Sequence, residues 1–421
     1  MRILVISNLY PPHAVGGYEE ACRDTVEGLR SRGHRVEVLT SAYGVARPRS
    51  EQGIHRLLQL DTAFLNEQPF HSRSLVSLWQ WNRRSAAALH RLLRRLRPDV
   101  VYVWNVLGLP MGLPTMAQRG GFPIVWMLQD IWMVDNMRRD PWVVAWNYRS
   151  RSATRRMAKA SLRRCVDHFL PTRLPNFERT SAHYASTALA TYYRQQGRRF
   201  RRERVIPNGI DRDTYSPIAR EWEAGPRKLL FMGRLEAGKG AHTAIEALAL
   251  LLHQRGPLTA TLTLVGASYD RPYRKMLYDL IHDHGLDAAV TIHAAVPRAA
   301  TAAIYAEHDI LLFPSRWIEG FGLVVLEALA RGLPVVGTAL GGTADMVRDD
   351  VTGLVVPPED AGALAMRVGD LLADPALARR LSEAGVEMVC RQFDRRHVNA
   401  QVEDYLHGVV APGGPGSAPC S

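Results

Sequence analysis

A strand, a glycine-rich turn and a helix follow one another in residues 228–253, which run KLLFMGRLEAGKGAHTAIEALALLLH. The run Lys228–Met232 is typical of a buried strand, and the spacing of apolar residues in Ala241–His253 favours a helix. The glycine-rich turn Gly233–Gly240 connects them. A strand that leads into a helix in this way is the building block of a parallel α/β sheet.

Strands and helices alternate along most of the chain. The pattern predicts strands at Ile3–Ser7, Val36–Thr40, Val100–Trp104, Ile124–Leu128, Thr261–Val265, Val290–His293, Ile310–Pro314 and Pro334–Gly337. It predicts helices at Tyr18–Arg30, Ser85–Leu96, Tyr273–His284, Pro297–Ala306 and Leu323–Arg331. Residues 135–204 show little periodicity, and their basic end, Arg198–Arg204, is typical of an exposed linker. We therefore expect two doubly wound α/β domains, 1–200 and 201–391, and a disordered tail at 411–421.

The composition is that of an ordinary globular protein. The chain has 421 residues, of which 47% are hydrophobic and 22% charged, and its formal net charge is +12. This balance excludes disorder over the whole chain, a collagen-like fibre and a small disulfide scaffold. The cysteines stand in no metal-ligand spacing, no signal-peptide pattern opens the chain, and no apolar stretch is long enough to span a membrane. We therefore expect a cytoplasmic protein.

Two cations, Arg234 and Lys239, mark the turn Gly233–Gly240. A glycine-rich turn lets the backbone approach an anion, and the helix after it adds N–H groups and the positive end of its dipole. These features fit a diphosphate, and an ordinary turn with two surface cations is the alternative. The turn is neither a P-loop, which needs GxxxxGK[ST], nor a GxGxxG dinucleotide fingerprint.

Two glutamates lie eight positions apart in residues 313–328, FPSRWIEGFGLVVLEA. Glu319 falls in the loop after a strand, at the carboxyl edge of the sheet where α/β proteins bind ligands. Gly322 and Leu323 would open the next helix and offer their amides to a phosphate. Glu327 lies among apolar residues, so its carboxylate needs a partner. That partner is either a sugar diol or a structural hydrogen bond.

The spacing of Glu319 and Glu327 resembles the Glu-x7-Glu motif of retaining glycosyltransferases with the GT-B fold, specifically glycosyltransferase family 4. The resemblance continues, over essentially residues 1–410, through the Gly16–Gly17 loop, IPNGID (206–211), the Gly233–Gly240 turn, LVG (264–266), GLPVV (332–336), GG (341–342) and TGLVVP (352–357). It implies two Rossmann-like domains that face each other across a cleft. Residues 1–200 would bind the acceptor, 201–391 would bind the nucleotide sugar, and a helix at 392–406 would cross back to the first domain.

The resemblance also implies roles for individual residues. Arg234, Lys239 and Glu319 would be catalytic: the two cations would stabilise the leaving diphosphate, and Glu319 would contact the transferred sugar. The donor-binding residues would be Gly16, Gly17, Gly233, Phe321, Gly322, Leu323 and Glu327, the last of them on the ribose. Where many family members have a His-Asp pair, this chain has Gln129 and Asp130, which are candidates for contact with the sugar or the acceptor. The resemblance implies no metal and no cofactor, because the cations would neutralise the diphosphate.

The implied function is that of a retaining hexosyltransferase. It would move a hexose or N-acetylhexosamine from a nucleotide-diphosphate sugar, with a UDP-sugar favoured, to an acceptor hydroxyl. The acceptor would be a polysaccharide, a lipid-linked intermediate or a secondary metabolite such as an aminocyclitol antibiotic precursor. The alternative is a GT-B protein that transfers no sugar, namely a sugar-nucleotide isomerase, a hydrolase or a non-catalytic sugar-nucleotide-binding protein.

Two basic runs, Arg151–Arg164 and Arg194–Arg204, leave a further partner open. They could contact an anionic membrane surface, at the inner face of the membrane, or simply form a solvated basic face. Nucleic acid is disfavoured, because the chain shows no nucleic-acid-binding motif.

Overall fold

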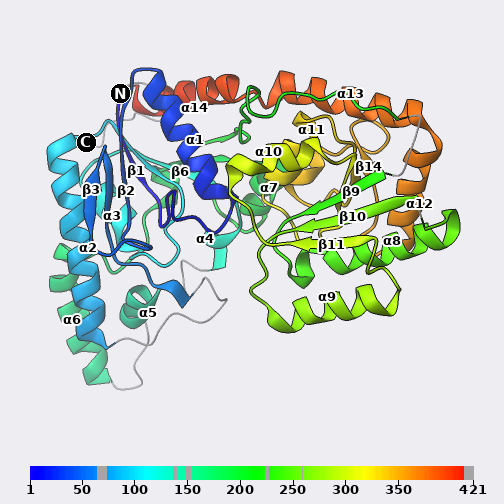
Figure 1. Cartoon of the computed structure of the whole chain (residues 1–421). Helices are drawn as coiled ribbons and strands as arrows, with labels where there is room; N and C mark the ends of the chain where they lie inside the picture. Colours follow the sequence, from blue (N-terminus) through cyan, green and yellow to red (C-terminus); the bar gives the residue numbers. More distant parts are fainter. Residues whose placement is uncertain (64–73, 136–139, 148–152, 223–226, 258, 412–421) are drawn as a thin grey trace. The chain divides into compact units, whose positions relative to one another are not determined.

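Two α/β units, each with its own sheet, make up the chain (Figure 1). The computed structural model describes residues 1–63, 74–135, 140–147, 153–222, 227–257 and 259–411. The first unit comprises Met1–Ala185, Leu189–Ile206 and the chain from Asn399 onward, and the second comprises Ser186–Ala188 and Pro207–Val398. The junction that we placed after residue 200 therefore falls at Ile206.

The first unit is built on an eight-stranded sheet in the order β3-β4-β2-β1-β5-β6-β7-β8. Its neighbouring strands are parallel except for β3 and β4, which are antiparallel. The strands are β1 (Arg2–Ile6), β2 (Arg35–Ser41), β3 (Arg49–Glu51), β4 (Ile54–Leu58), β5 (Val100–Val103), β6 (Ile124–Leu128), β7 (Ser181–Tyr184) and β8 (Arg202–Val205). The central strands β5 and β6 are buried throughout and almost wholly apolar, as expected for a parallel sheet covered on both faces.

Eight helices within the described ranges accompany this sheet, most of them between its strands. They are α1 (Gly17–Ser31), α2 (Leu75–Leu96), α3 (Gly112–Arg119), α4 (Trp132–Asp135), α5 (Pro141–Asn147), α6 (Ala153–Phe169), α7 (Thr187–Gln195) and the last helix of the chain, α14 (Arg395–Val410). Helix α2 starts well before the predicted Ser85. The hydroxyl oxygen of Ser74 accepts a hydrogen bond from the amide of Ser77 (3.2 Å) and so caps this earlier start.

Two predictions near the end of the first unit need correction. Arg202–Val205 is not part of an exposed linker but forms β8, which pairs with β7 at the edge of the sheet. An edge strand tolerates charged side chains because part of it stays in water. The helix expected at 392–406 is α14, which begins at Arg395 and ends at Val410. Residues 412–421 of the predicted tail, and the first residues of the basic run Arg151–Arg164, lie outside the described residues.

The second unit has a six-stranded, all-parallel sheet in the order β11-β10-β9-β12-β13-β14. The strands are β9 (Arg227–Met232), β10 (Ala260–Val265), β11 (Val290–His293), β12 (Ile310–Phe313), β13 (Val335–Gly337) and β14 (Leu354–Val355). The helices are α8 (Ala241–Arg255), α9 (Arg271–Asp283), α10 (Arg298–Ala306), α11 (Leu323–Ala330), α12 (Ala361–Ala373) and α13 (Pro375–Gln392). All strands and helices predicted in this unit are confirmed.

The strand order brings the two predicted motifs of the second unit together. Strand β9 lies between β10 and β12, so the loops that follow β9 and β12 leave the same edge of the sheet side by side. Helix α8 packs against β10, and α9 packs against α8, as Figure 1 shows. Among the described residues no helix has both the length and the apolar character needed to cross a bilayer.

Candidate active site

The turn after β9 is shaped by its glycines. The amide of Gly233 donates to the carbonyl of Val265 (3.0 Å), and a short 3-10 turn, Ala237–Lys239, leads into α8. Gly240 has a φ of +77°, and a Cβ there would lie 2.2 Å from the carbonyl oxygen of Pro314. A glycine is therefore required at this position, because both the conformation and the close backbone contact exclude a side chain.

Lys239 and Glu319 form an ion pair across the two loops. The ammonium of Lys239 lies 2.7 Å from Oε1 of Glu319, and the two side chains are only 17% and 13% exposed. The hydroxyl of Ser315 donates to the same oxygen (2.6 Å). The backbone of Glu319 is also fixed, because its carbonyl accepts a hydrogen bond from the amide of Gly342 (2.6 Å). Glu319 thus holds the ammonium of Lys239 in a defined position at the carboxyl edge of the sheet.

Trp317 brings an aromatic ring to the two cations. Nζ of Lys239 lies 5.6 Å from the centroid of the ring, and Cζ of Arg234 lies 5.8 Å from it. Arg234 also pairs with Glu236 (3.0 Å) and remains 44% exposed. The cations are therefore close to one another, and contact with the negative face of an aromatic ring offsets part of their repulsion.

Glu327 is buried in α11 and is held by residues of α10. The hydroxyl of Tyr305 donates to Oε2 of Glu327 (3.1 Å), and Nε of Arg298 lies 3.6 Å from Oε1. Burial raises the pKa of Tyr305 well above its usual value, so its hydroxyl stays protonated and serves as the donor. The partner of this carboxylate in the structure is thus a side-chain network.

The start of α11 has the expected form. Gly322, the residue before the helix, has a φ of +91°, and a Cβ there would lie 2.7 Å from a methyl carbon of Thr343. Leu323 is the first residue of the helix. The side chain of Phe321 is buried, and its ring lies 5.9 Å from that of Phe393. Phe321 therefore contributes to packing in this structure, and only its backbone is available to a ligand.

The first unit carries the other four predicted residues. Gly16 and Gly17 open α1, where the carboxylate of Glu19 accepts hydrogen bonds from the amides of Val15 and Gly16 (3.0 Å each). Glu19 is fully buried, and this burial raises its pKa. A Cβ on Gly16 would make only an ordinary contact with Glu19. Among the described residues of this unit, no contact therefore requires a glycine at position 16.

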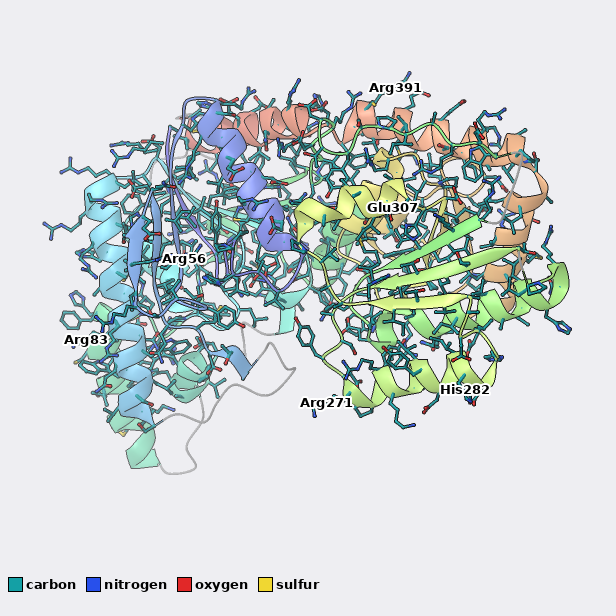
Figure 2. The ribbon with its side chains drawn as sticks, viewed as in Figure 1. Arg56, Arg83, Arg271, His282, Glu307 and Arg391 are labelled. Carbon is teal, nitrogen blue, oxygen red and sulfur yellow. The ribbon has the colours of Figure 1, made fainter. Side chains whose placement is uncertain are left out.

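The loop before α1 is held by a buried arginine. Arg56 of β4, which Figure 2 labels within the first unit, donates from Nη1 to the carbonyl of Tyr10 (3.0 Å) and from Nη2 to that of Pro11. Sequence analysis did not single out Arg56, because nothing near position 56 shows that its side chain reaches this loop. Arg56 fixes the segment that leads to Gly16 and Gly17.

Gln129 and Asp130 follow β6, and Asp130 has a shifted pKa. Its carboxylate accepts a hydrogen bond from the amide of Trp132 (2.8 Å), and its carbonyl accepts one from the hydroxyl of Tyr193 (2.9 Å). Burial, reinforced by the charge of Glu19, raises the pKa of Asp130 to about 6. A carboxyl group of this kind can accept a hydrogen bond from a sugar hydroxyl when ionised and donate one when protonated.

One cluster in the described residues has side chains that could ligate a metal: His34, Glu403 and His407. Its groups already have partners, because Nε2 of His34 lies 2.7 Å from Glu403 and Nδ1 lies 2.9 Å from the N-terminal amine. Glu403 pairs in addition with Arg32. We therefore interpret the cluster as an ion-pair network that attaches α14 to the first unit.

Comparison with known proteins identifies the family. Residues 15–214 match the family model described as Glycosyltransferase Family 4, and residues 216–388 match the model described as Glycosyl transferases group 1. The chain is 28% identical to the glycogen synthase of Mycobacterium tuberculosis over 417 residues. This alignment covers 96% of this chain and 94% of that protein.

Two further comparisons agree. A GDP-mannose-dependent α-(1-6)-phosphatidylinositol monomannoside mannosyltransferase of Mycolicibacterium smegmatis is 33% identical over 217 residues, 48% of this chain and 56% of that protein. The structure of Anabaena Alr3699/HepE in complex with UDP and glucose superposes with a TM-score of 0.66 at 21% identity, over 96% of this chain and 99% of that one. The Anabaena structure supports the fold, and the glycogen synthase and the mannosyltransferase favour a transferase over a GT-B protein that transfers no sugar. The chain therefore belongs to glycosyltransferase family 4 and is a hexosyltransferase with the GT-B fold.

Proposed function

We propose that this glycosyltransferase is retaining and uses a UDP-sugar as its donor. It moves a hexose or N-acetylhexosamine to a hydroxyl of a polysaccharide, a lipid-linked intermediate or a secondary metabolite such as an aminocyclitol. The observation that carries the proposal is the Lys239–Glu319 ion pair beside Arg234, at the edge where the loops after β9 and β12 meet. Two cations there suit a leaving group that departs as a nucleoside diphosphate.

The chemistry follows from this arrangement of charges. As the bond between the sugar and the diphosphate breaks, negative charge develops on the phosphate oxygens. Arg234 and Lys239 are already in place to stabilise that charge, and such preorganised groups are often the largest contribution to catalysis. The acceptor hydroxyl attacks from the same face of the sugar and passes its proton to the departing phosphate. Glu327 accepts hydrogen bonds from the ribose hydroxyls, and Gln129 and Asp130 contact the sugar or the acceptor.

The base of the donor nucleotide is the least constrained part of the proposal. The Anabaena protein was solved with UDP, whereas the name of the Mycolicibacterium relative specifies GDP-mannose. A GDP-sugar is therefore the second candidate donor.

A nucleotide screen tests the donor site. The melting temperature is measured with UDP, GDP, ADP and dTDP for the wild type and for Glu327→Gln, because a ligand that binds only the folded state raises it. We expect UDP to give the largest shift and the variant to reduce it. A larger shift with GDP would replace the UDP assignment, and equal shifts in both proteins would remove Glu327 from the donor site.

A further inference from the structure

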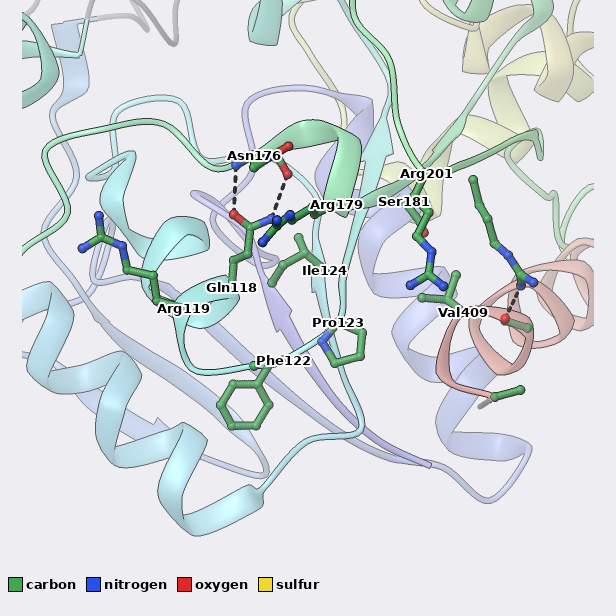
Figure 3. Close-up of a pocket in the computed structure, with 14 residues that line it drawn as sticks. Gln118, Arg119, Phe122, Pro123, Ile124, Asn176, Arg179, Ser181, Arg201 and Val409 are labelled. Atoms are coloured by element: carbon green, nitrogen blue, oxygen red, sulfur yellow. Dashed lines mark hydrogen bonds between the residues drawn. The ribbon is translucent and has the colours of Figure 1, made fainter. Parts of the chain in front are cut away.

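A pocket of about 400 Å³ lies in the first unit, at the amino edge of its sheet (Figure 3). Residues at the starts of β6, β7 and β8 line it, together with the C-terminal ends of α3 and α14. Gly16 and Asp130 follow strands β1 and β6 and therefore lie at the opposite, carboxyl edge. The pocket is thus separate from the residues assigned to glycosyl transfer.

The lining of this pocket is strongly basic. It contains Arg119, Arg179, Arg201 and Arg202, and none of the described residues that line it is acidic. Two of these arginines have structural partners: Arg119 pairs with Asp167 (2.6 Å), and Arg202 donates to the carbonyl of Gly408 at the end of α14. Within the described part of the chain, Arg179 and Arg201 form no ion pair. Both side chains are exposed to solvent and line the same pocket.

The rest of the lining suits a small organic molecule. On one side of the pocket, the side-chain amide of Gln118 donates to the carbonyl of Asn176 and accepts from its backbone amide (2.8 Å each). On the other side, Figure 3 shows Arg201 beside Val409. Phe122 and Pro123 add an apolar wall. The volume falls within the range of small-molecule sites, roughly 300–1,000 Å³, and exceeds what a bare phosphate ion would fill.

We propose that this pocket binds a phosphate monoester, with the phosphate between Arg179 and Arg201 and the organic part against Phe122 and Pro123. A guanidinium group presents two parallel N–H donors that match two oxygens of a phosphate. The ligand is either a free phosphate ester or the phosphate headgroup of a lipid, and the proposal does not depend on the nucleotide specificity of the active site.

Binding to the full-length protein tests the proposal. Glycerol 3-phosphate is titrated by calorimetry at low ionic strength, and flotation is measured with phosphatidylcholine vesicles with and without phosphatidic acid. The variants are Arg179→Gln and Arg201→Gln. The matched control is Arg199→Gln, an exposed arginine of the same basic segment that does not line the pocket. Arg234→Gln, in the second unit, separates this pocket from the proposed diphosphate site.

We expect the wild type, Arg199→Gln and Arg234→Gln to bind alike, and each pocket variant to bind about tenfold more weakly, because a charge-assisted hydrogen bond is lost. Binding to the soluble ester identifies a free metabolite as the ligand, and binding only to phosphatidic acid vesicles identifies a lipid headgroup. Three results would overturn the proposal: no binding in either assay, equal binding by all variants, or loss of binding in Arg234→Gln alone.

Discussion

Replacement of Lys239 by methionine isolates the charge on which the proposed mechanism depends. Methionine keeps most of the length and the apolar surface of the side chain but removes the ammonium. In the folded protein that ammonium lies 2.7 Å from Glu319, which also accepts a hydrogen bond from Ser315. The variant therefore leaves Glu319 with a neutral partner only and removes one of the two cations near the leaving group.

The size of both effects can be worked out. Removing one partner from a fully buried ion pair costs about 3–5 kcal/mol. Because Lys239 and Glu319 are 17% and 13% exposed and Glu319 keeps its bond from Ser315, we expect a loss of about 1–2 kcal/mol in the free energy of unfolding. Removing a preorganised group that stabilises charge in the transition state typically lowers kcat by about 10²–10³-fold. A domain with an unfolding free energy of about 5–15 kcal/mol stays almost entirely folded after a loss of about 1–2 kcal/mol. Unfolding therefore cannot account for the expected loss of kcat.

The assay measures nucleotide release from the donor identified in the nucleotide screen, and urea denaturation measures stability. Lys275→Met is the matched control, because Lys275 pairs with Asp279 on α9 and is 77% exposed. We expect the control to be within about twofold of the wild type in kcat. A turnover of Lys239→Met within about threefold of the wild type would refute the assignment of Lys239 to the leaving group.

A double-mutant cycle then separates two roles of Glu319. If Glu319 acts by holding Lys239 in place, Glu319→Gln should add little once Lys239 is already methionine, because residues that act as a unit are not additive. If Glu319 contacts the transferred sugar itself, the two losses should multiply. The two outcomes separate the role that the family resemblance implies for Glu319, contact with the sugar, from the hydrogen bond to Lys239 that the structure shows.

Three further predictions concern single residues. The pKa of Asp130, raised to about 6, means that the folded state keeps a proton that the unfolded state loses between about pH 4 and 6. The free energy of unfolding of the wild type should therefore fall as pH rises through that window. Asp130→Asn should raise the free energy of unfolding by up to about 3 kcal/mol at pH 8 but not at pH 4. An equal effect of the substitution at pH 4 and at pH 8 would contradict this. Gly16→Ala should leave the melting temperature unchanged, because the added Cβ makes only an ordinary contact with Glu19. The variant should lower kcat/KM if the loop at Gly16 must approach the donor. A lower melting temperature would show that any loss of activity comes from instability. Tyr305→Phe should cost about 1–2 kcal/mol of stability and weaken nucleotide binding, because Glu327 loses a hydrogen bond; unchanged nucleotide affinity would separate this network from the donor site.

Local sequence was sufficient to predict much of the fold and the motifs that carry the site residues, but not the contacts between those residues. The alternation of apolar strands and helices depends on residues a few positions apart, so the central strands of both sheets, among them β1, β9 and β12, could be predicted. The strands at or near the sheet edges, β3, β4, β7, β8 and β14, were not predicted, because they are short or carry polar residues. The Gly233–Gly240 turn and the pair Glu319 and Glu327 were also visible, because motif spacing is a local property. The linker predicted at Arg198–Arg204 was wrong at β8, because pairing with β7 overrides the charged composition of an edge strand.

The partners of the site residues were decided by tertiary structure alone. The order of the strands places β9 beside β12, and only this brings Lys239 within 2.7 Å of Glu319, eighty positions away. Tyr305 and Arg298 reach Glu327 because α10 packs against α11, and Arg56 reaches the loop before Gly16 from β4. Sequence specifies which groups need partners, since a buried charge must be compensated. Which groups supply that compensation depends on contacts between distant segments, and these exist only in the folded chain.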